Sequence, residues 1–154
     1  MKIHRLKTIQ FIPTTLETAW DFFSSPINLK EITPEYMDFN ITSDFSKDTK
    51  MYPGMLISYT VKPVLGIPIT WVTEITQVNH HKHFIDEQRF GPYRMWHHEH
   101  FFKELEGGVE MTDEVTYVLP FGMLGEMGHG LFIKKQLKDI FDYRCKRVEE
   151  IFRF

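Results

Sequence analysis

The stretch FGPYRMWHHEHFF, residues 90–102, predicts one strand of a β-hairpin that carries polar groups on its less exposed face. Side chains alternate across a strand, so Trp96, His98 and His100 share one side. The intervening His97 lies on the other. Two imidazoles between large aromatic side chains are unusual as core filling, so this side of the strand is the first candidate for a functional site.

The following segment, GVEMTDEVTYVLP, predicts the partner strand, because the turn LEGG before it suits a two-residue connection whose residues need positive φ. A turn at residues 106–107 pairs His100 with Asp113. A turn one residue further along the chain pairs His98 with Tyr117 instead. Both registers place the two histidines, Asp113 and Tyr117 on one face of the hairpin, so this grouping does not depend on the turn.

The composition of the chain fits one globular domain spanning residues 1–154. Aromatic residues make up 15% of the sequence and supply bulky apolar surface for a core or a cavity wall. The formal net charge is −3 and there is no long basic stripe, which argues against a nucleic acid partner. The one cysteine, Cys145, cannot form an intrachain disulfide, which fits a reducing compartment.

The N-terminal segment MKIHRLKTIQFIP has no apolar core of signal-peptide length. No window of the sequence approaches the ~18 consecutive apolar residues of a membrane span. We therefore expect a soluble, cytoplasmic protein without stable insertion into a membrane.

The N-terminal part of the chain predicts a strand followed by helices. Residues 3–11 alternate loosely and fit a first strand. Thr14 and Glu17 have the spacing of a capping box, so a helix over about residues 15–24 should follow. The segment NLKEI, which ends shortly before Pro34, predicts a short second helix.

The remainder of the chain predicts a sheet and a covering helix. From residue 39 to 119 the pattern is strand-like and broken by turn signals, which indicates six successive strands in an antiparallel meander. The glycine-rich FGMLGEMGHG after Pro120 predicts a turn or a flexible entrance. Apolar residues then recur at three- and four-residue spacing to the end, which predicts an amphipathic helix of roughly six turns.

These elements define an α+β fold class. Its core is a curved seven-stranded antiparallel sheet wrapped around a long C-terminal helix, with two short helices between strands 1 and 2. A sheet that curves around a helix leaves a space between them. An apolar space of this kind is where small molecules bind.

Three pieces of the chain carry a resemblance to a known family. They are FIPTTLETAWDFFSSPINLKEITP near the start, FIDEQRFGPYRMWHHEHFF in the middle, and MTDEVTYVLPFGMLG followed by LKDIFDYR at the end. With nearly its full length, the chain resembles the SRPBCC superfamily of helix-grip proteins, also called START-like or Bet v 1-like. It is most similar to the polyketide cyclase/dehydrase-like ligand-binding members. The resemblance implies one cavity that carries hydrophobic ligands, binds lipids or quinones, or hosts aromatase/cyclase chemistry, and some members are co-chaperones. A shared fold does not choose among these functions.

His98, His100, Asp113 and Tyr117 form the central candidate site. In an aromatic pocket they would bind the polar end of an apolar ligand. One alternative is a satisfied polar network that fixes the strand register. Another is a cyclase or dehydratase in which a histidine is the base and Tyr117 the donor. No nucleophile, phosphate loop or cofactor signature accompanies the group, so we favour binding and expect no cofactor.

Metal binding is a further alternative, because His98 and His100 have the H-x-H spacing that lets two strand residues converge on one ion. Asp113 or Asp86 would have to supply a third ligand. No second cluster of His or Cys clearly shares this face of the strand. The sequence alone therefore predicts no metal.

The preceding strand adds Asp86 and Gln88. A three-residue loop in the FGPY turn aligns Asp86 with His98 and Gln88 with Trp96, whereas a two-residue loop aligns Asp86 with His97. The resemblance favours the three-residue loop. The predicted ligand-binding set combines polar and apolar side chains: Trp20, Tyr59, Trp71, Phe84, Asp86, Gln88, Trp96, His98, His100, Asp113, Tyr117, Phe121 and Leu137.

The function expected from the sequence is therefore the binding of a small hydrophobic ligand, either lipid-like, polyketide-like or aromatic. The enzymatic alternative uses the same cavity. A third interpretation is a protein-interaction module with a vestigial cavity. The sequence leaves the oligomeric state open.

Overall fold

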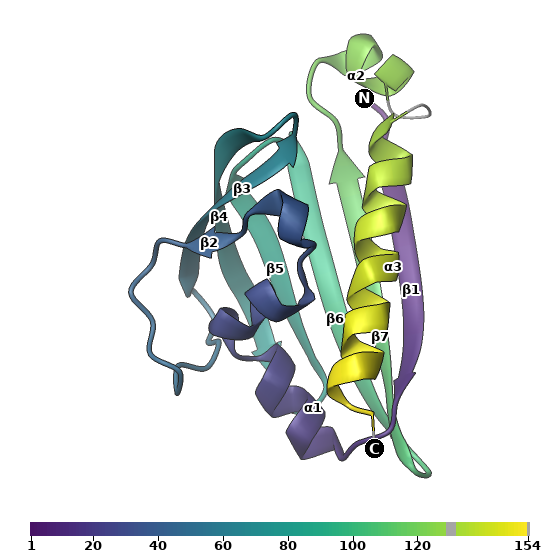
Figure 1. The fold of residues 1–154 in the computed structure, drawn as a ribbon. Coiled ribbons are helices and arrows are strands. Elements are labelled where there is room, and N and C mark those ends of the chain that lie inside the picture. Colours follow the sequence, from purple (N-terminus) through teal and green to yellow (C-terminus); the bar gives the residue numbers. More distant parts are fainter. Residues whose placement is uncertain (129–131, 154) are drawn as a thin grey trace.

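The computed structural model describes residues 1–128 and 132–153 (Figure 1). Its strands are β1 (His4–Ile12), β2 (Asn40–Ile41), β3 (Leu56–Val64), β4 (Ile67–Asn79), β5 (His83–Phe90), β6 (Met95–Leu105) and β7 (Gly108–Val118). Its helices are α1 (Leu16–Phe23), α2 (Gly122–Gly128) and α3 (Lys134–Ile151), with the 3-10 helices η1 (Pro26–Ile32) and η2 (Glu35–Met37). No helix in these two ranges is both long enough and apolar enough to cross a membrane.

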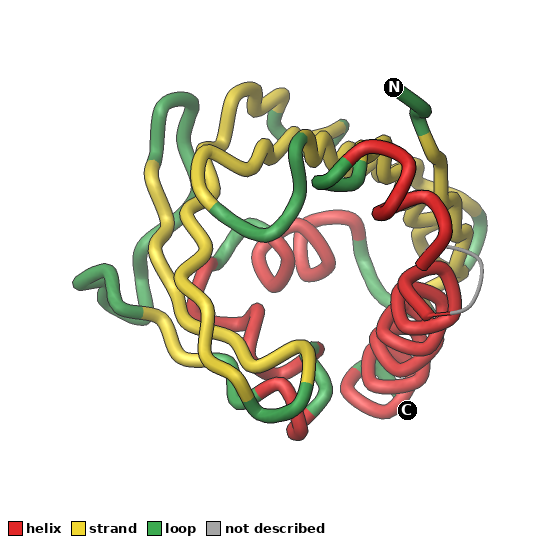
Figure 2. Tube along the Cα trace, turned by 90° about the horizontal axis from the view of Figure 1, so that it is seen from above, coloured by secondary structure: helices red, strands yellow, loops and turns green. Residues whose placement is uncertain are grey.

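The seven strands form one antiparallel sheet in the order β1-β7-β6-β5-β4-β3-β2. The sheet curves around the interior, and α3 lies along its concave side (Figures 1 and 2). This arrangement confirms the predicted α+β class and the helix-grip architecture. Neighbours in the sheet are neighbours in the chain everywhere except at β1, which pairs with β7 and so brings the N-terminus beside the last strand.

Helix α1 begins one residue later than the predicted capping box requires. Thr15 is the N-cap, and its side-chain oxygen accepts the backbone N–H of Thr18 at 3.1 Å. The pairing of Thr14 with Glu17 is therefore wrong. The backbone N–H of Thr14 donates to the carbonyl of Ile12 at 2.9 Å, so Thr14 still belongs to the turn that leaves β1.

The segment between α1 and β3 is more irregular than predicted. In place of one short helix it contains two 3-10 helices, and the second ends at Asp38, whose φ is +45°. The expected strand DFNITSD reduces to the two residues of β2. Beyond them the backbone N–H groups of Thr42 and Ser43 both donate to the carbonyl of Ser58, so the regular ladder cannot continue.

The β6–β7 hairpin adopts the first of the two predicted registers. Leu105 pairs with Gly108, so the turn lies at residues 106–107, and His100 pairs with Asp113. Only Gly107 of the two turn residues has a positive φ, +79°, whereas the prediction gave both residues one. Gly108 has a different reason to lack a side chain, because a Cβ there would lie 2.4 Å from the carbonyl oxygen of Ile12 on β1.

The β5–β6 pairing confirms the predicted alignment of Asp86 with His98. The accompanying pair of Gln88 with Trp96 is wrong. The side-chain amide of Gln88 instead accepts the backbone N–H of Tyr93 at 3.1 Å and donates to its carbonyl at 2.6 Å. These two bonds close the connection between the strands, so the ladder stops one residue before Gln88.

Helix α3 spans 18 residues, about five turns, and is one turn shorter than predicted. It bridges two distant parts of the sheet. Gln10 on β1 donates its amide to the carbonyl of Cys145 at 2.7 Å, and Gln136 donates to the carbonyl of Pro63 on β3. The two contacts hold α3 across the concave side of the sheet (Figure 2).

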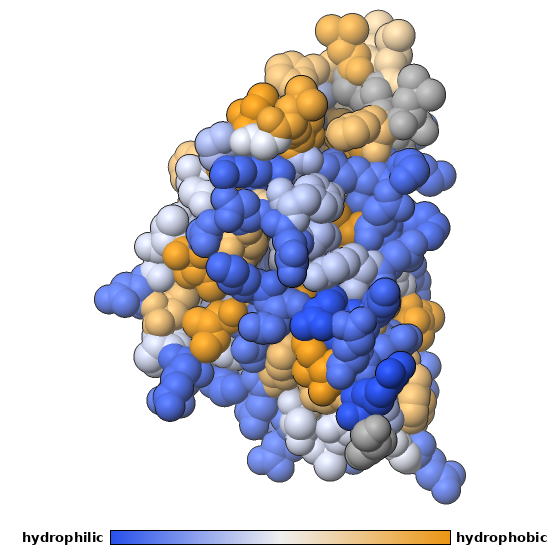
Figure 3. Space-filling view, in the orientation of Figure 1, coloured by the Kyte–Doolittle hydropathy of each residue, from blue (hydrophilic) through white to orange (hydrophobic). Residues whose placement is uncertain are grey.

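The glycine-rich segment after Pro120 folds as helix α2 where a turn or flexible entrance was expected. Residues 129–130 of this segment lie outside the described residues. Phe121, Met123 and Leu124 are exposed here, and apolar side chains gather at this end of the molecule (Figure 3). These side chains thus form an apolar patch on α2 and the residue before it, and α2 lies near the N-terminal end of α3 (Figure 1).

Candidate functional site

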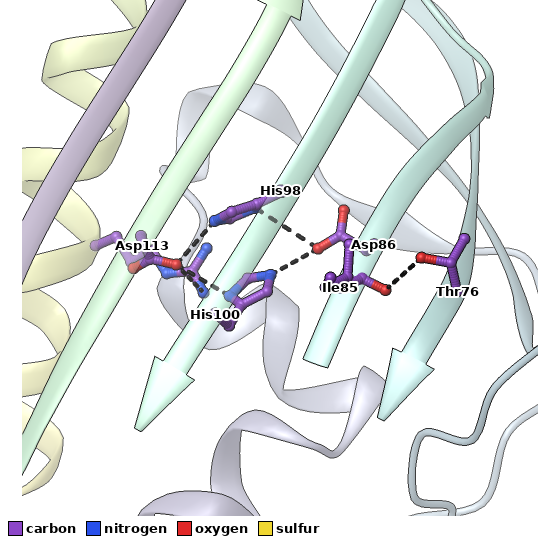
Figure 4. Close-up of polar contacts among 7 residues, drawn as sticks. Thr76, Ile85, Asp86, His98, His100 and Asp113 are labelled. Carbon is purple, nitrogen blue, oxygen red and sulfur yellow. Dashed lines mark hydrogen bonds and ion pairs between the residues drawn. The ribbon is translucent and has the colours of Figure 1, made fainter. Parts of the chain in front are cut away.

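Three adjacent strands bring the polar candidates together on the concave side of the sheet (Figure 4). Asp86 on β5 is directly opposite His98 on β6. Two residues along β6, His100 is opposite Asp113 on β7. The four side chains therefore form a compact group on neighbouring strands, which we call the His/Asp cluster.

Each imidazole of the His/Asp cluster lies between the two carboxylates. His98 approaches Asp113 with Nε2, 2.8 Å from Oδ1, and Asp86 with Nδ1, 3.6 Å from Oδ2. His100 approaches Asp86 with Nε2, 2.6 Å from Oδ2, and Asp113 with Nδ1, 3.0 Å from Oδ1. The two rings lie almost against each other, with centroids 3.7 Å apart.

Aromatic side chains surround the cluster and remove it from water. The ring of Phe84 stacks on His100 at a centroid distance of 4.1 Å, and the ring of Phe141 from α3 meets His98 edge-on at 5.6 Å. The side chains of His98 and His100 are only 6% and 3% exposed. Because bulk water solvates these imidazoles poorly, their charges must be balanced mostly by neighbouring groups.

A fifth charged group, Arg144 on α3, completes that balance. One Nη atom of Arg144 lies 3.8 Å from Asp113 Oδ1. The Nε atom of Arg144 is buried and has no hydrogen-bond partner among the described residues. Arg144 follows Leu137 and Phe141 at helical spacing on the inward face of α3. This helical spacing could have identified Arg144 as a site residue from the sequence, but Arg144 was not among the predicted site residues.

The buried surroundings push the two histidines in opposite directions. Burial, reinforced by the charge of His100, lowers the pKa of His98 to about 4. Burial also lowers the pKa of His100, but the hydrogen bonds and charges of Asp113 and Asp86 outweigh it, so this pKa is raised. The reason for the difference is that His100 makes two close carboxylate contacts, whereas one of the two contacts of His98 is long.

The two carboxyl groups are both held in the ionised form. Burial raises the pKa of Asp113, but Arg144 and the histidines outweigh it and bring the pKa well below its usual value. The pKa of Asp86 is lowered for the same kind of reason, with His98 and His100 opposing the effect of burial. Arg144 and the two histidines therefore oppose the charges of two ionised carboxylates within one buried group.

The protonation of His98 follows from its neighbours. An ionised carboxylate only accepts hydrogen bonds, so the close contact with Asp113 requires the proton of neutral His98 to be on Nε2. Nδ1 of His98 is then an unprotonated acceptor that faces Asp86.

A cavity of about 540 Å³ lies between the sheet, η1 and α3. It is bounded mostly by apolar side chains, with Asp86, His98, His100 and Arg144 in its wall. The sequence-predicted residues that line it are Tyr59, Trp71, Phe84, Asp86, Trp96, His98, His100, Phe121 and Leu137. Its wall also includes Tyr93 from the β5–β6 connection, which the sequence reasoning missed because an irregular connection has no periodic pattern.

Four predicted ligand-binding residues lie outside the cavity wall. Trp20 packs in the core, with its ring 5.3 Å from that of Phe102, and Gln88 closes the β5–β6 connection. Asp113 lies beyond the two imidazoles and contacts them from behind. Tyr117 stacks on His4 of β1 at 5.3 Å. Tyr117 shares the face of the histidines and Asp113, as predicted, but it packs against His4 and Trp96 and does not line the cavity.

Comparison with solved structures identifies the fold. The chain is similar to CV1439 from Chromobacterium violaceum, with a TM-score of 0.74 and 10% identity over 97% of this chain and 98% of that one. It is also similar to TTHA0849 from Thermus thermophilus, with a TM-score of 0.73 and 13% identity over 96% and 95% of the two chains. The Bet v 1-like protein Ara h 8.0201 has a TM-score of 0.59 and 15% identity over 97% and 99%. At these identities the likeness shows a helix-grip fold of the Bet v 1 type.

Comparison of sequences adds no family to this result. No known family's sequence profile matches the chain. No curated protein matches it either.

Proposed function

We propose that the protein binds a small hydrophobic ligand in the cavity between the sheet and α3. The observation that carries this proposal is an apolar cavity of about 540 Å³ with a few polar groups in one part of its wall. Ligand sites typically have volumes of roughly 300–1,000 Å³ and combine apolar walls with a small number of orienting polar groups. The helix-grip fold and the resemblance to polyketide cyclase/dehydrase-like ligand-binding proteins agree with this use of the cavity.

The wall offers both kinds of hydrogen-bonding group to a ligand. Trp71 Nε1 and Arg144 Nε are buried donors that have no partner among the described residues. Asp86 and Nδ1 of His98 are acceptors at the same cavity. A buried polar group without a partner is unfavourable by roughly 1–3 kcal/mol, so a ligand oxygen that accepts from these donors would gain affinity.

The apolar body of the ligand would lie against aromatic rings. Tyr59 and Trp71 stack at 5.9 Å, and Trp71 meets Trp96 edge-on at 5.4 Å. Such rings provide large, rigid contact surfaces at little cost in side-chain entropy. This wall suits flat aromatic or polyketide-like molecules as well as lipid chains.

The enzymatic alternative has less support from the geometry. A cyclase or dehydratase was expected to use a histidine as base and Tyr117 as proton donor. His98 is neutral and lines the cavity, but Tyr117 lies outside the cavity wall. We therefore propose binding as the function and keep turnover as an outcome of the test.

Binding of the apolar dye ANS tests the cavity directly. Val61 on β3 is buried and lines the cavity, so V61F should fill part of it and weaken dye binding on the order of tenfold. Leu56 on the same strand is exposed and does not line the cavity, so L56F should bind as the wild type does. Equal binding by V61F, L56F and wild type, with all three folded by circular dichroism, would contradict the proposal.

Native mass spectrometry of protein purified from its own host would identify the ligand class. A retained small molecule should dissociate on denaturation and should be absent from V61F. If the retained molecule is chemically converted on incubation, and conversion stops in H98Q while binding remains, then the enzymatic alternative replaces simple binding.

A further inference from the structure

Every nitrogen of the two buried imidazoles lies within 3.6 Å of a carboxylate oxygen, and the pattern is ordered. Nδ1 of His98 and Nε2 of His100 both face Oδ2 of Asp86, at 3.6 and 2.6 Å. The opposite nitrogens, Nε2 of His98 and Nδ1 of His100, both face Oδ1 of Asp113, at 2.8 and 3.0 Å. The cluster therefore has an inner side, which includes Asp86, and an outer side, which includes Asp113.

From this pattern we propose that Asp86, His98 and His100 form a binding site for one divalent transition-metal ion. One ligand atom from each of the three residues lies within 4.8 Å of the other two. Two imidazoles and one carboxylate are a ligand set used for Zn²⁺ and for non-haem Fe²⁺. The inference is separate from the proposed binding of an apolar ligand, although both concern the same cavity.

The distances suit an ion after a small adjustment. Zn–N and Zn–O bonds of about 2.0–2.2 Å place the ligand atoms of a tetrahedral site roughly 3.3–3.5 Å apart. The 3.6 Å between His98 Nδ1 and Asp86 Oδ2 already agrees with this spacing. The 2.6 Å between His100 Nε2 and the same oxygen is a hydrogen bond, and an ion that replaces its proton would widen the contact by less than about 1 Å.

Asp113 supplies the support that metal-bound histidines require. A histidine ligand normally donates its other N–H to a carboxylate, which fixes the ring and keeps the coordinating nitrogen unprotonated. Asp113 Oδ1 is hydrogen-bonded to His98 Nε2, lies 3.0 Å from His100 Nδ1, and is itself close to Arg144. His100 Nδ1 makes no hydrogen bond among the described residues, so a small rotation of this ring is needed before Asp113 can accept from both rings. The outer nitrogens can thus hold the protons while the two inner nitrogens present lone pairs toward Asp86.

The ion would be accessible from the cavity. The three proposed ligand residues line the cavity wall, whereas Asp113 does not. Three protein ligands leave at least one coordination position for another molecule, as in catalytic zinc sites. A ligand atom in the cavity, such as an oxygen, would complete the coordination of the ion.

The outer face of the same strands provides a matched control. His97 Nδ1 lies 2.7 Å from Glu87 Oε1, and its Nε2 lies 3.8 Å from Glu99. This group has histidine and carboxylate chemistry similar to that of the inner cluster. This outer group contains only one imidazole and is partly exposed. It therefore cannot offer two histidine nitrogens to one ion, as the inner cluster can.

The test uses the full-length protein after treatment with EDTA and dialysis. Zn²⁺ binding is measured by calorimetry, and Co²⁺ binding is measured by its visible absorption. Wild type and H97Q should each bind one ion per chain, and the Co²⁺ spectrum should show nitrogen ligands in a site of low coordination number. Asp113→Asn should weaken binding by roughly 10–100-fold, because the carboxylate that orients His98 and lies beside His100 is lost.

Two further variants remove single coordinating nitrogens and keep the supporting bonds. In H98Q the amide nitrogen can replace Nε2 and still donate to Asp113, whereas Nδ1 is lost. In H100N the amide nitrogen can replace Nδ1, whereas Nε2 is lost. Each should weaken Zn²⁺ binding by more than about 100-fold, since losing a ligand exceeds losing its support.

Two results would overturn the metal site. One is wild-type protein, folded and free of EDTA, that takes up neither ion in a saturable way. The other is binding that H98Q and H100N retain, or that H97Q abolishes. In both cases ANS binding to wild type and its loss in V61F would still support the apolar ligand site, so the two proposals can fail separately.

Discussion

Replacing Asp113 by Asn removes one charge from the centre of the buried cluster and changes almost nothing in shape. Asp113 is 6% exposed and lies 2.8 Å from His98, 3.0 Å from His100 and 3.8 Å from Arg144. Without its charge, Arg144 loses its buried counter-ion and both imidazoles lose a carboxylate neighbour. Breaking a buried charge pair in this way typically destabilises a protein by about 3–5 kcal/mol. At about 2–4 °C per kcal/mol for a chain of this size, Tm should fall by roughly 6–20 °C.

The assay is urea denaturation followed by circular dichroism, with EDTA present so that metal binding does not contribute. The control is E114Q on the same strand, because Glu114 pairs with Lys7 near the surface, where the two side chains are 38% and 55% exposed. A surface pair of this kind contributes no more than about 1 kcal/mol. Combining Asp113→Asn with R144M should recover part of the lost stability, since the unpaired cation is then gone. If Asp113→Asn and E114Q lower the free energy of unfolding equally, the argument for a tightly coupled buried cluster fails.

Core, turn and pH predictions follow from the same structure and are measured as free energies of unfolding. I12A should lose about 2–5 kcal/mol because Ile12 is fully buried, whereas I9A on the same strand should change by less than about 0.5 kcal/mol because Ile9 is 60% exposed. Gly108→Ala should destabilise more than Gly107→Ala, because its Cβ would meet backbone at 2.4 Å, whereas at Gly107 only the positive φ opposes it; equal losses would contradict this. Since burial holds the pKa of His98 at about 4, below its ordinary 6.5, the unfolded chain takes up this proton first as pH falls. Stability should therefore decrease between about pH 6.5 and pH 4 in wild type, and less steeply in H98Q; parallel curves would refute the assignment.

Alternation and turn chemistry predicted most of the sheet because both are local. The period of two placed His98 and His100 on one face, and this held for either turn. The alternating pattern could not decide which of the two turns forms. In the structure Gly108 lies so close to Ile12 of β1 that a side chain would not fit, and β1 is distant from the hairpin in the sequence. The choice of register therefore depends on a long-range contact that the hairpin's own residues do not reveal.

Other errors arose where two local solutions were nearly equal. Thr14 and Thr15 are both acceptable N-cap residues, and only the path of the chain out of β1 selects the second. Gln88 was expected to follow Asp86 in the ladder, but its amide satisfies the backbone of Tyr93 in the connection. In each case a side chain competes for a backbone group, which hydrophobic periodicity does not describe.

The sequence predicted that a cavity exists, but it could not predict the volume of the cavity or all of the residues in its wall. A curved sheet around a helix implies a space, yet its volume depends on which side chains reach across it. Trp20 and Tyr117 have the size and polarity of wall residues, but they pack into the core and against β1. Arg144 enters the site from α3, and nothing in the hairpin sequence points to it.

The sequence left open whether the His/Asp cluster locks the strand register or binds a ligand, and the structure allows these two roles to be weighed. Register is already specified by the pairing of β6 with β7 from Met95–Val118 to Leu105–Gly108, and by the turn that Gly107 and Gly108 require. A buried ionic cluster is not needed to set the register that the strand pairing and the turn already set. Well-packed apolar residues in its place would often give a protein of equal or greater stability. A cluster needed only for register could also be fully enclosed by the core. Three of its four members instead face a cavity, and one of them presents an unprotonated nitrogen toward an ionised carboxylate. Those features have a use only when something else enters the cavity, and they therefore favour binding over a purely structural role.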